Sequence, residues 1–135
     1  MDILVVNLDK STQRLAEMSK RLEQLDLPFT RVSAVYGASL TNDELNRHYN
    51  SALNKRVYRR PLSAAEIGCY LSHRNIWQTI VDDNLTMALI LEDDAELGAQ
   101  LPAALATVEN LTRPWDVIKL YEPQIKKPLA RSIPL

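Results

Sequence analysis

The stretch that decides the fold is Ile3-Leu4-Val5-Val6-Asn7-Leu8-Asp9-Lys10-Ser11, at the start of the chain. Its first four residues are all apolar, which is typical of a strand covered on both faces of a parallel sheet. Asn7 ends the apolar run, and Ser11 can cap a helix by accepting a backbone N–H of the first turn. A buried strand, a polar turn and a helix predict the first unit of an α/β fold.

The rest of the chain repeats this alternation of strands and helices. Two capping boxes, Thr41-Asn42-Asp43-Glu44 and Ser63-Ala64-Ala65-Glu66, mark helix starts, and the second predicts a long helix that reaches about Val81. The expected fold is α/β, with a mainly parallel sheet and helices on both faces. Strands are predicted over 3–6, 29–33, 87–91 and 117–121, further helices over 11–25 and 101–111, a loop over 51–61 and an irregular tail over 122–135.

Composition and charge exclude several classes of protein. With 135 residues, 46% of them apolar, the chain fits one folded domain. A formal net charge of −1 argues against a nucleic-acid-binding protein, and a single cysteine excludes an internal disulfide framework. The chain contains no run of about 18 apolar residues, so no transmembrane helix is predicted. The N-terminus does not resemble a signal peptide, so we expect a cytoplasmic protein.

The most informative stretch is Leu89-Ile90-Leu91-Glu92-Asp93-Asp94-Ala95, in which three carboxylates follow a predicted buried strand. Adjacent carboxylates repel, so an opposing charge is expected among them, and residues 75–112 contain no basic side chain. Mg²⁺ or Mn²⁺ would meet this need. If strand geometry persists, Glu92 and Asp94 point to one side and hold the metal, while Asp93 faces a sugar hydroxyl or a backbone cap. The alternative is a solvated loop in which Asp94 caps the next helix.

Polar residues also follow the first strand. Such sheets bind ligands beyond the carboxyl ends of their strands. Arg14 and the helix N-terminus suit a diphosphate, and Asn7 or Asp9 could bind a base or ribose. The alternatives are ordinary capping for Asp9 and a solvated charge for Arg14.

The long helix carries a polar and aromatic stripe formed by Glu66, Tyr70, His73 and Trp77. Aromatic faces suit sugar C–H surfaces, and Glu66 and His73 can bind hydroxyl groups. The alternative places Glu66 only in its capping box and leaves His73 half-buried. Cys69, on the same helix, is interpreted as a small buried apolar residue.

A basic segment lies before that helix and contains no acidic residue. A mobile basic loop could attract an anionic donor, or hold the protein at an anionic membrane by weak contacts. The alternative is a merely solvated loop. The basic residues concerned are Arg47, Lys55, Arg56, Arg59 and Arg60.

The opening stretch, the segment Leu62-Ser63-Ala64-Ala65-Glu66-Ile67-Gly68-Cys69-Tyr70-Leu71-Ser72-His73 and the acidic run occur in that order. The chain resembles glycosyltransferase family 25, the lipooligosaccharide galactosyltransferases and their collagen-modifying relatives. The resemblance extends through Trp115-Asp116-Val117-Ile118-Lys119-Leu120. It implies a GT-A-like, Rossmann-like nucleotide-sugar-binding domain over 1–121.

The resemblance also implies transfer of galactose from UDP-galactose to a glycan or glycolipid acceptor in lipooligosaccharide or lipopolysaccharide biosynthesis. The acidic run stands where the family has its metal-binding motif, so Glu92 and Asp94 are the expected ligands of Mn²⁺ or Mg²⁺. On the same basis Asp93, Glu66 and His73 are expected on the catalytic side.

Two departures from the family pattern affect this interpretation. Family members typically continue well beyond this length, and they tend to have Asp where this chain has Tyr36 before Gly37. We therefore expect a folded homo-oligomer that binds the donor, transfers sugar weakly or not at all, and contacts the inner face of the membrane at most peripherally. The alternative is a truncated, non-catalytic family member that binds UDP or a protein partner. A different metal-dependent phosphotransfer enzyme is a weaker alternative, because no glycine-rich phosphate loop is present.

Overall fold

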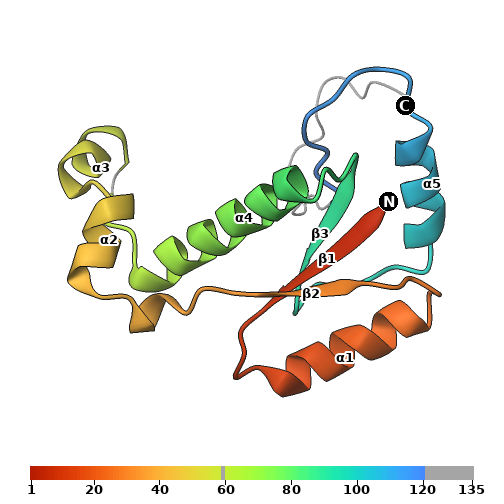
Figure 1. Cartoon of the computed structure of the whole chain (residues 1–135), viewed down its shortest axis with the longest axis horizontal. Coiled ribbons are helices and arrows are strands. Elements are labelled where there is room, and N and C mark those ends of the chain that lie inside the picture. Colours follow the sequence, from red (N-terminus) through yellow and green to blue (C-terminus); the bar gives the residue numbers. More distant parts are fainter. Residues whose placement is uncertain (59, 121–135) are drawn as a thin grey trace, which may run out of the picture.

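The computed structural model describes residues 1–58 and 60–120, and every structural statement below concerns these residues. Strands and helices alternate along the chain, as the sequence predicts (Figure 1). The elements are β1 (Asp2–Asn7), α1 (Thr12–Glu23), β2 (Thr30–Ser33), the 3₁₀ turn η1 (Gly37–Ser39), α2 (Asn42–His48), α3 (Ser51–Val57), α4 (Ala64–Asp82), β3 (Ala88–Glu92) and α5 (Leu101–Glu109).

The sheet has three parallel strands in the order β2-β1-β3. Leu4 of β1 is paired with Thr30 on one side and with Ile90 on the other. Because all three strands run in one direction, their carboxyl ends meet at the same edge of the sheet. The mainly parallel α/β arrangement predicted from the sequence is confirmed and agrees with a Rossmann-like fold.

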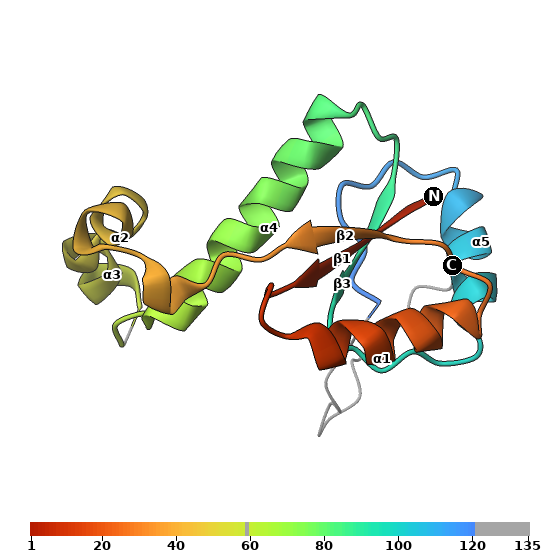
Figure 2. The same cartoon turned by 60° about the horizontal axis from the view of Figure 1, so that its bottom comes forward.

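Helices cover both faces of this sheet (Figure 2). The side chains of β1 alternate between the two faces. Leu4 and Val6 pack with Ile76 of α4 on one face. Val5 packs with Met18 and Leu22 of α1 on the other face. This alternation explains why the opening strand is apolar at every position and not only at every second one.

A close contact of backbones joins η1 to α4. A Cβ atom added at Gly37 would lie 1.8 Å from the carbonyl oxygen of Ala64, and one added at Gly68 would lie 2.7 Å from the backbone nitrogen of Gly37. The missing side chains therefore let η1 lie directly against the first turns of α4. The α2 and α3 helices extend from this end of α4, beyond the carboxyl ends of the strands (Figures 1 and 2).

Both predicted capping boxes are present. The Thr41 hydroxyl accepts a hydrogen bond from the backbone N–H of Glu44, and the Ser63 hydroxyl accepts one from that of Glu66. Ser11 differs, because its side chain makes no cap hydrogen bond to the α1 backbone. Its φ of −93° and ψ of 50° lie outside the extended region typical of an N-cap, and its hydroxyl accepts from Arg14 Nη2 at 3.1 Å instead.

Two predictions about secondary structure are wrong. The loop expected over 51–61 contains α3, which begins where the Asn50 side chain accepts the backbone N–H of Leu53 at 2.9 Å. The segment has no helical period of apolar residues, because α3 has no buried residue, and the local cap stabilises the start of the helix instead. The strand expected over 117–121 is not formed over 117–120, where Val117 is 83% exposed. Residues 117–120 include β-branched side chains that favour a strand, but no strand of the described chain pairs with them.

Tyr121 and the tail predicted over 122–135 lie outside the described residues, as does Arg59. Within the described part of the chain, no helix combines the length and the apolar character needed to cross a membrane.

Candidate functional site at the carboxyl edge of the sheet

Asn7, the last residue of β1, is the centre of a polar network at this edge. Its side-chain nitrogen donates to Asp93 Oδ2 at 2.6 Å and to the Ser11 carbonyl at 3.0 Å. Its side-chain oxygen accepts from Arg31 Nε at 3.1 Å. Asn7 is only 2% exposed, so both amide N–H groups are used inside the protein. The structure therefore places Asn7 beneath the surface as a positioning residue, where the sequence suggested direct contact with a nucleotide.

Asp93 and Arg14 form the next layer of this network. Arg14 Nη1 lies 3.2 Å from Asp93 Oδ1 and 3.6 Å from Asp94 Oδ2. Asp93 is 7% exposed, whereas the Arg14 side chain is 45% exposed. The guanidinium thus offsets part of the negative charge of two carboxylates and still faces solvent. This pairing supplies part of the opposing charge that the sequence required.

Asp9 lies in the turn between β1 and α1, and side chains of β2 hold its carboxylate. Its carboxylate forms an ion pair with Arg31 and accepts from Ser33 Oγ at 2.7 Å. These hydrogen bonds lower the pKa of Asp9, with Arg31 as the larger cause. Arg31 and Ser33 are functional-site residues that no motif in the sequence marks. The signal was present, because parallel pairing with β1 brings the end of β2 to the same edge.

A small open hollow of about 210 Å³ lies over this part of the edge. Its position, at the end of β1 and the start of α1, is where parallel α/β sheets bind ligands. Asp9 thus lies in a hollow, as a ligand-binding role requires. The lining residues are Asn7, Asp9, Thr12, Leu15 and Arg31.

The acidic run divides between the two helical layers. Glu92 Oε1 lies 3.3 Å from His73 Nε2 of α4, whereas Asp94 approaches Arg14 of α1. The sequence predicts Glu92 and Asp94 on one side if strand geometry continues. It does not continue, because β3 ends at Glu92 and the chain turns at Asp93 and Asp94. Their predicted role as metal ligands stays a prediction.

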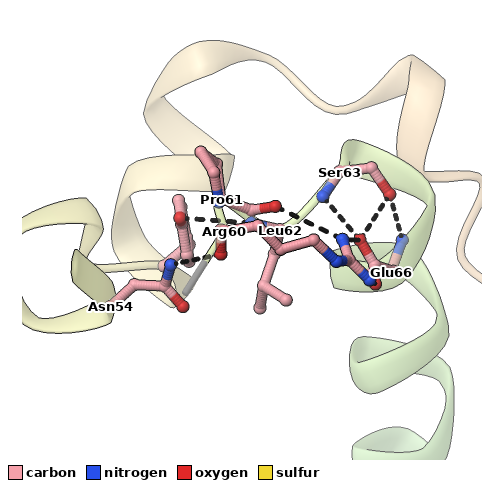
Figure 3. A network of polar contacts seen from close by, with 7 residues as sticks. Asn54, Arg60, Pro61, Leu62, Ser63 and Glu66 are labelled. Carbon is pink, nitrogen blue, oxygen red and sulfur yellow. Dashed lines mark hydrogen bonds and ion pairs between the residues drawn. The ribbon is translucent and has the colours of Figure 1, made fainter. Parts of the chain in front are cut away.

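Glu66 lies at the N-terminus of α4 in a set of contacts separate from His73. Its carboxylate accepts from Arg60 Nη1 at 2.9 Å and Nη2 at 2.5 Å, and from the Ser63 backbone N–H at 2.8 Å (Figure 3). Arg60 first, then Ser63, lowers the pKa of Glu66 to about 2. A carboxylate this acidic is a poor proton acceptor near neutral pH, which argues against Glu66 as a general base.

We expect Glu66→Gln to destabilise the protein at neutral pH and to have little effect in acid. A carboxyl whose pKa is lower in the folded protein stabilises the fold above its unfolded pKa, near 4.5, and loses that contribution as the pH falls towards 2. Thermal unfolding at pH 7 and near pH 2 should show the difference between wild type and variant shrinking. Glu17→Gln is the control, because among the described residues the Glu17 carboxylate accepts one hydrogen bond, from Gln13, on an exposed surface. An equal difference at both pH values would contradict the prediction.

The stripe predicted on α4 is solvent-exposed. Tyr70 is 50% exposed and Trp77 is 53% exposed, so these aromatic residues are not part of the core. Cys69 is also exposed, and its predicted burial is wrong. The buried residues of α4 include Gly68, Leu71 and Ser72, whereas Cys69 is exposed, one turn before His73.

Tyr36, which stands where family members tend to have Asp, lies against a basic side chain. Lys10 Nζ is 3.5 Å from the centre of the Tyr36 ring. The basic segment lies farther from the sheet. Lys55 and Arg56 belong to the last turn of α3, and Arg60 is paired with Glu66. Its described part is therefore helical over 51–57 and not the continuous loop that the sequence suggested.

Together, a parallel sheet and charged side chains at the carboxyl ends of its strands define a ligand-binding domain of the α/β class. The model of one protein family, "Glycosyltransferase family 25 (LPS biosynthesis protein)", matches residues 1–129. The chain therefore belongs to glycosyltransferase family 25, as the resemblance indicated.

Similar curated proteins carry matching names. The chain is 32% identical over 126 residues to "Procollagen galactosyltransferase 1-B" of Xenopus laevis, covering 88% of this chain and 21% of that protein. It is 29% identical over 147 residues to "Procollagen galactosyltransferase 2" of Homo sapiens, covering 98% and 22%. A "Glycosyltransferase 25 family member" of Anopheles gambiae is 34% identical over 95 residues, covering 68% and 16%. The chain thus spans about a fifth of the length of these relatives.

Proposed function

We propose that this chain forms the donor-binding part of a glycosyltransferase that transfers galactose from UDP-galactose to a glycan or glycolipid acceptor. The proposal rests on one observation above all. In a chain of glycosyltransferase family 25, the ends of β1 and β3 bring Asp9, Asp93 and Asp94 together with two arginines at one edge of the sheet. We further propose the setting of lipooligosaccharide or lipopolysaccharide biosynthesis, in keeping with the description of the family.

A divalent metal is part of this proposal. Glu92 and Asp94 have side chains that are 57% and 64% exposed, and both offer the oxygen atoms that Mg²⁺ and Mn²⁺ prefer. The chemistry of these two carboxylates suits such an ion, but they face different helical layers in this structure, so Glu92 would have to turn from His73 to share a metal with Asp94. The bound metal would neutralise charge on the diphosphate as UDP departs.

The surrounding side chains would position the donor. The exposed part of Arg14 can bind a phosphate oxygen, and Asp9 in its hollow can accept hydrogen bonds from a ribose or base. Asp93 is held in place by Asn7 and Arg14, which suits a carboxylate that orients a sugar hydroxyl. His73 and Glu66 stay candidates on the catalytic side, and the low pKa of Glu66 suits a carboxylate that binds a hydroxyl group and does not take up its proton.

Asp94→Asn should weaken UDP binding in the presence of Mn²⁺ by about tenfold, which corresponds to about 1.4 kcal/mol. The change removes a charged metal ligand and retains the size of the side chain. Calorimetric titration of UDP with Mn²⁺, and again with a chelator, measures both affinities. Asp43→Asn is the control, because Asp43 lies in the first turn of α2, away from the edge. Equal affinity in wild type and Asp94→Asn, or no effect of the chelator, would refute the metal assignment.

We also propose that the chain self-associates. Within residues 1–58 and 60–120, β2 and β3 each have one edge without a neighbouring strand, and exposed strand edges favour pairing with another chain. Light scattering should give a mass above that of the 15.3 kDa monomer. A monomer at high concentration would contradict this prediction.

Two further parts of the proposal concern sugar transfer by this chain and its location in the cell. Release of UDP in the presence of a galactose acceptor separates an active transferase from a family member that binds UDP without turnover. We propose a cytoplasmic protein, with the basic residues of α2 and α3 facing an anionic membrane. Binding to vesicles that contain anionic lipid tests the membrane contact.

A further inference from the structure

Three side chains with different metal-binding atoms converge between α4 and the end of β3. Cys69 Sγ, a ring nitrogen of His73 and a Glu92 carboxylate oxygen all lie within 4.8 Å of one another. Cys69 and His73 are four residues apart, so they occupy one face of α4 a single turn apart. The register of the sheet brings the third side chain to this turn of α4. Glu92 pairs with Val6 of β1 at the last position of β3 and faces His73.

The spacing is close to what a tetrahedral metal needs. Zinc lies about 2.3 Å from sulfur and about 2.0–2.2 Å from nitrogen or oxygen, so its ligand atoms are about 3.5 Å apart. His73 Nε2 and Glu92 Oε1 are already 3.3 Å apart. Movements of about 1 Å by exposed side chains would therefore close the site, without a change in the backbone.

The chemical environment also favours a cation. In the described part of the chain, Glu92 forms no ion pair with Lys or Arg, and its carboxylate lies 3.3 Å from the His73 ring nitrogen Nε2. A thiol that coordinates a metal ion is deprotonated, so a bound metal would hold Cys69 as a thiolate beside Glu92.

We propose that Cys69, His73 and Glu92 bind Zn²⁺ as a three-ligand site with an open fourth position. A thiolate and an imidazole select zinc over Mg²⁺ and Mn²⁺, whose preferred ligands are oxygen atoms. Three protein ligands with one open position are the pattern of zinc sites that also bind water or a small ligand. The side chains of His73 and Glu92 are 29% and 57% exposed, so the ion can enter from solvent.

This site is distinct in chemistry from the Mn²⁺ or Mg²⁺ site of the proposed function, but the two share Glu92. A zinc ion held by Cys69 and His73 would keep Glu92 turned towards α4 and away from Asp94. Zinc would then oppose metal-dependent donor binding. Asp94 takes no part in the zinc site, so it separates the two assignments experimentally.

The test uses Co²⁺ as a spectroscopic substitute for zinc, with the chain kept reduced. A cobalt–thiolate bond gives a sulfur-to-metal charge-transfer band in the near ultraviolet, which requires Cys69 because the chain has one cysteine. We expect this band in the wild type and its loss in Cys69→Ser. Competition with a chromogenic chelator should show zinc binding weakened by about tenfold or more in Cys69→Ser and His73→Gln, since losing even a supporting outer-shell partner costs tenfold.

Two variants serve as matched controls. His48→Gln removes the other histidine, which lies beside Arg74, and should leave the cobalt band and zinc affinity unchanged. Asp94→Asn should also leave both unchanged while it weakens UDP binding with Mn²⁺, so failure of either proposal can be told from failure of the other. Absence of the band in the wild type, or equal zinc affinity in wild type and Cys69→Ser, would overturn the zinc site.

Discussion

Asn7→Asp is expected to lower the free energy of unfolding by about 2–4 kcal/mol at pH 7. The new side chain has nearly the same shape, so no cavity forms. It replaces an N–H donor, 2.6 Å from Asp93 Oδ2, by a second carboxylate oxygen in a buried position. The Ser11 carbonyl loses its donor as well. Chemical denaturation of wild type and variant measures the difference.

The pH dependence of this variant provides a second readout. Two adjacent carboxylates cannot both ionise without cost, so one of them takes a pKa above its unfolded value, near 3.9. A carboxyl with a raised pKa in the folded protein destabilises the fold above that pKa, and the deficit disappears as the pH falls below the unfolded value. The difference between wild type and Asn7→Asp should therefore shrink in acid.

Asn46→Asp is the control for the Asn7 variant, because Asn46 is exposed on α2 and should change stability by no more than about 0.5 kcal/mol. If both variants are equally stable at pH 7, the network around Asn7 does not hold the edge of the sheet together. If Asn7→Asp alone is destabilised and recovers in acid, the buried contact with Asp93 is the cause.

Much of the fold could be predicted because local and tertiary signals agree. The run Ile3–Val6 is apolar at every position, and it forms the central strand with α1 and α4 on its two faces. The α3 helix was missed because it is stabilised by the cap at Asn50 and buries no apolar face, so periodicity had nothing to detect. Residues 117–120 have strand-forming side chains but no partner strand, and pairing is a tertiary property.

The candidate site was predictable in its position and less so in its details. The expectation that polar residues after β1 and β3 share one edge is confirmed by the hydrogen bond between Asn7 and Asp93. The directions of the acidic side chains depend on the residue at which β3 ends, and the sequence pattern does not identify that residue. The role of Asn7 depends on Arg31, which lies on a different strand, so its burial could not be derived from the opening stretch alone.

The contact between η1 and α4 leads to the second large prediction. Gly37→Ala is expected to destabilise the protein by about 3 kcal/mol, the upper part of the usual range for overpacking. Its Cβ would lie 1.8 Å from the Ala64 carbonyl oxygen and 2.5 Å from the Ala64 carbonyl carbon. Both are backbone atoms, so no side chain can rotate away, and η1 has to separate from α4. Urea denaturation measures the loss.

Gly98→Ala is the matched control, because a Cβ added there meets nothing within 4 Å. Gly98 has no positive φ, so alanine fits its backbone and should be neutral or stabilise by up to about 1 kcal/mol through the unfolded state. Similar effects at Gly37 and Gly98 would mean that the close approach is not maintained in solution. A large loss at Gly37 alone would show that the backbone contact between η1 and α4 stabilises the fold, and α4 is the helix that carries His73, 3.3 Å from Glu92.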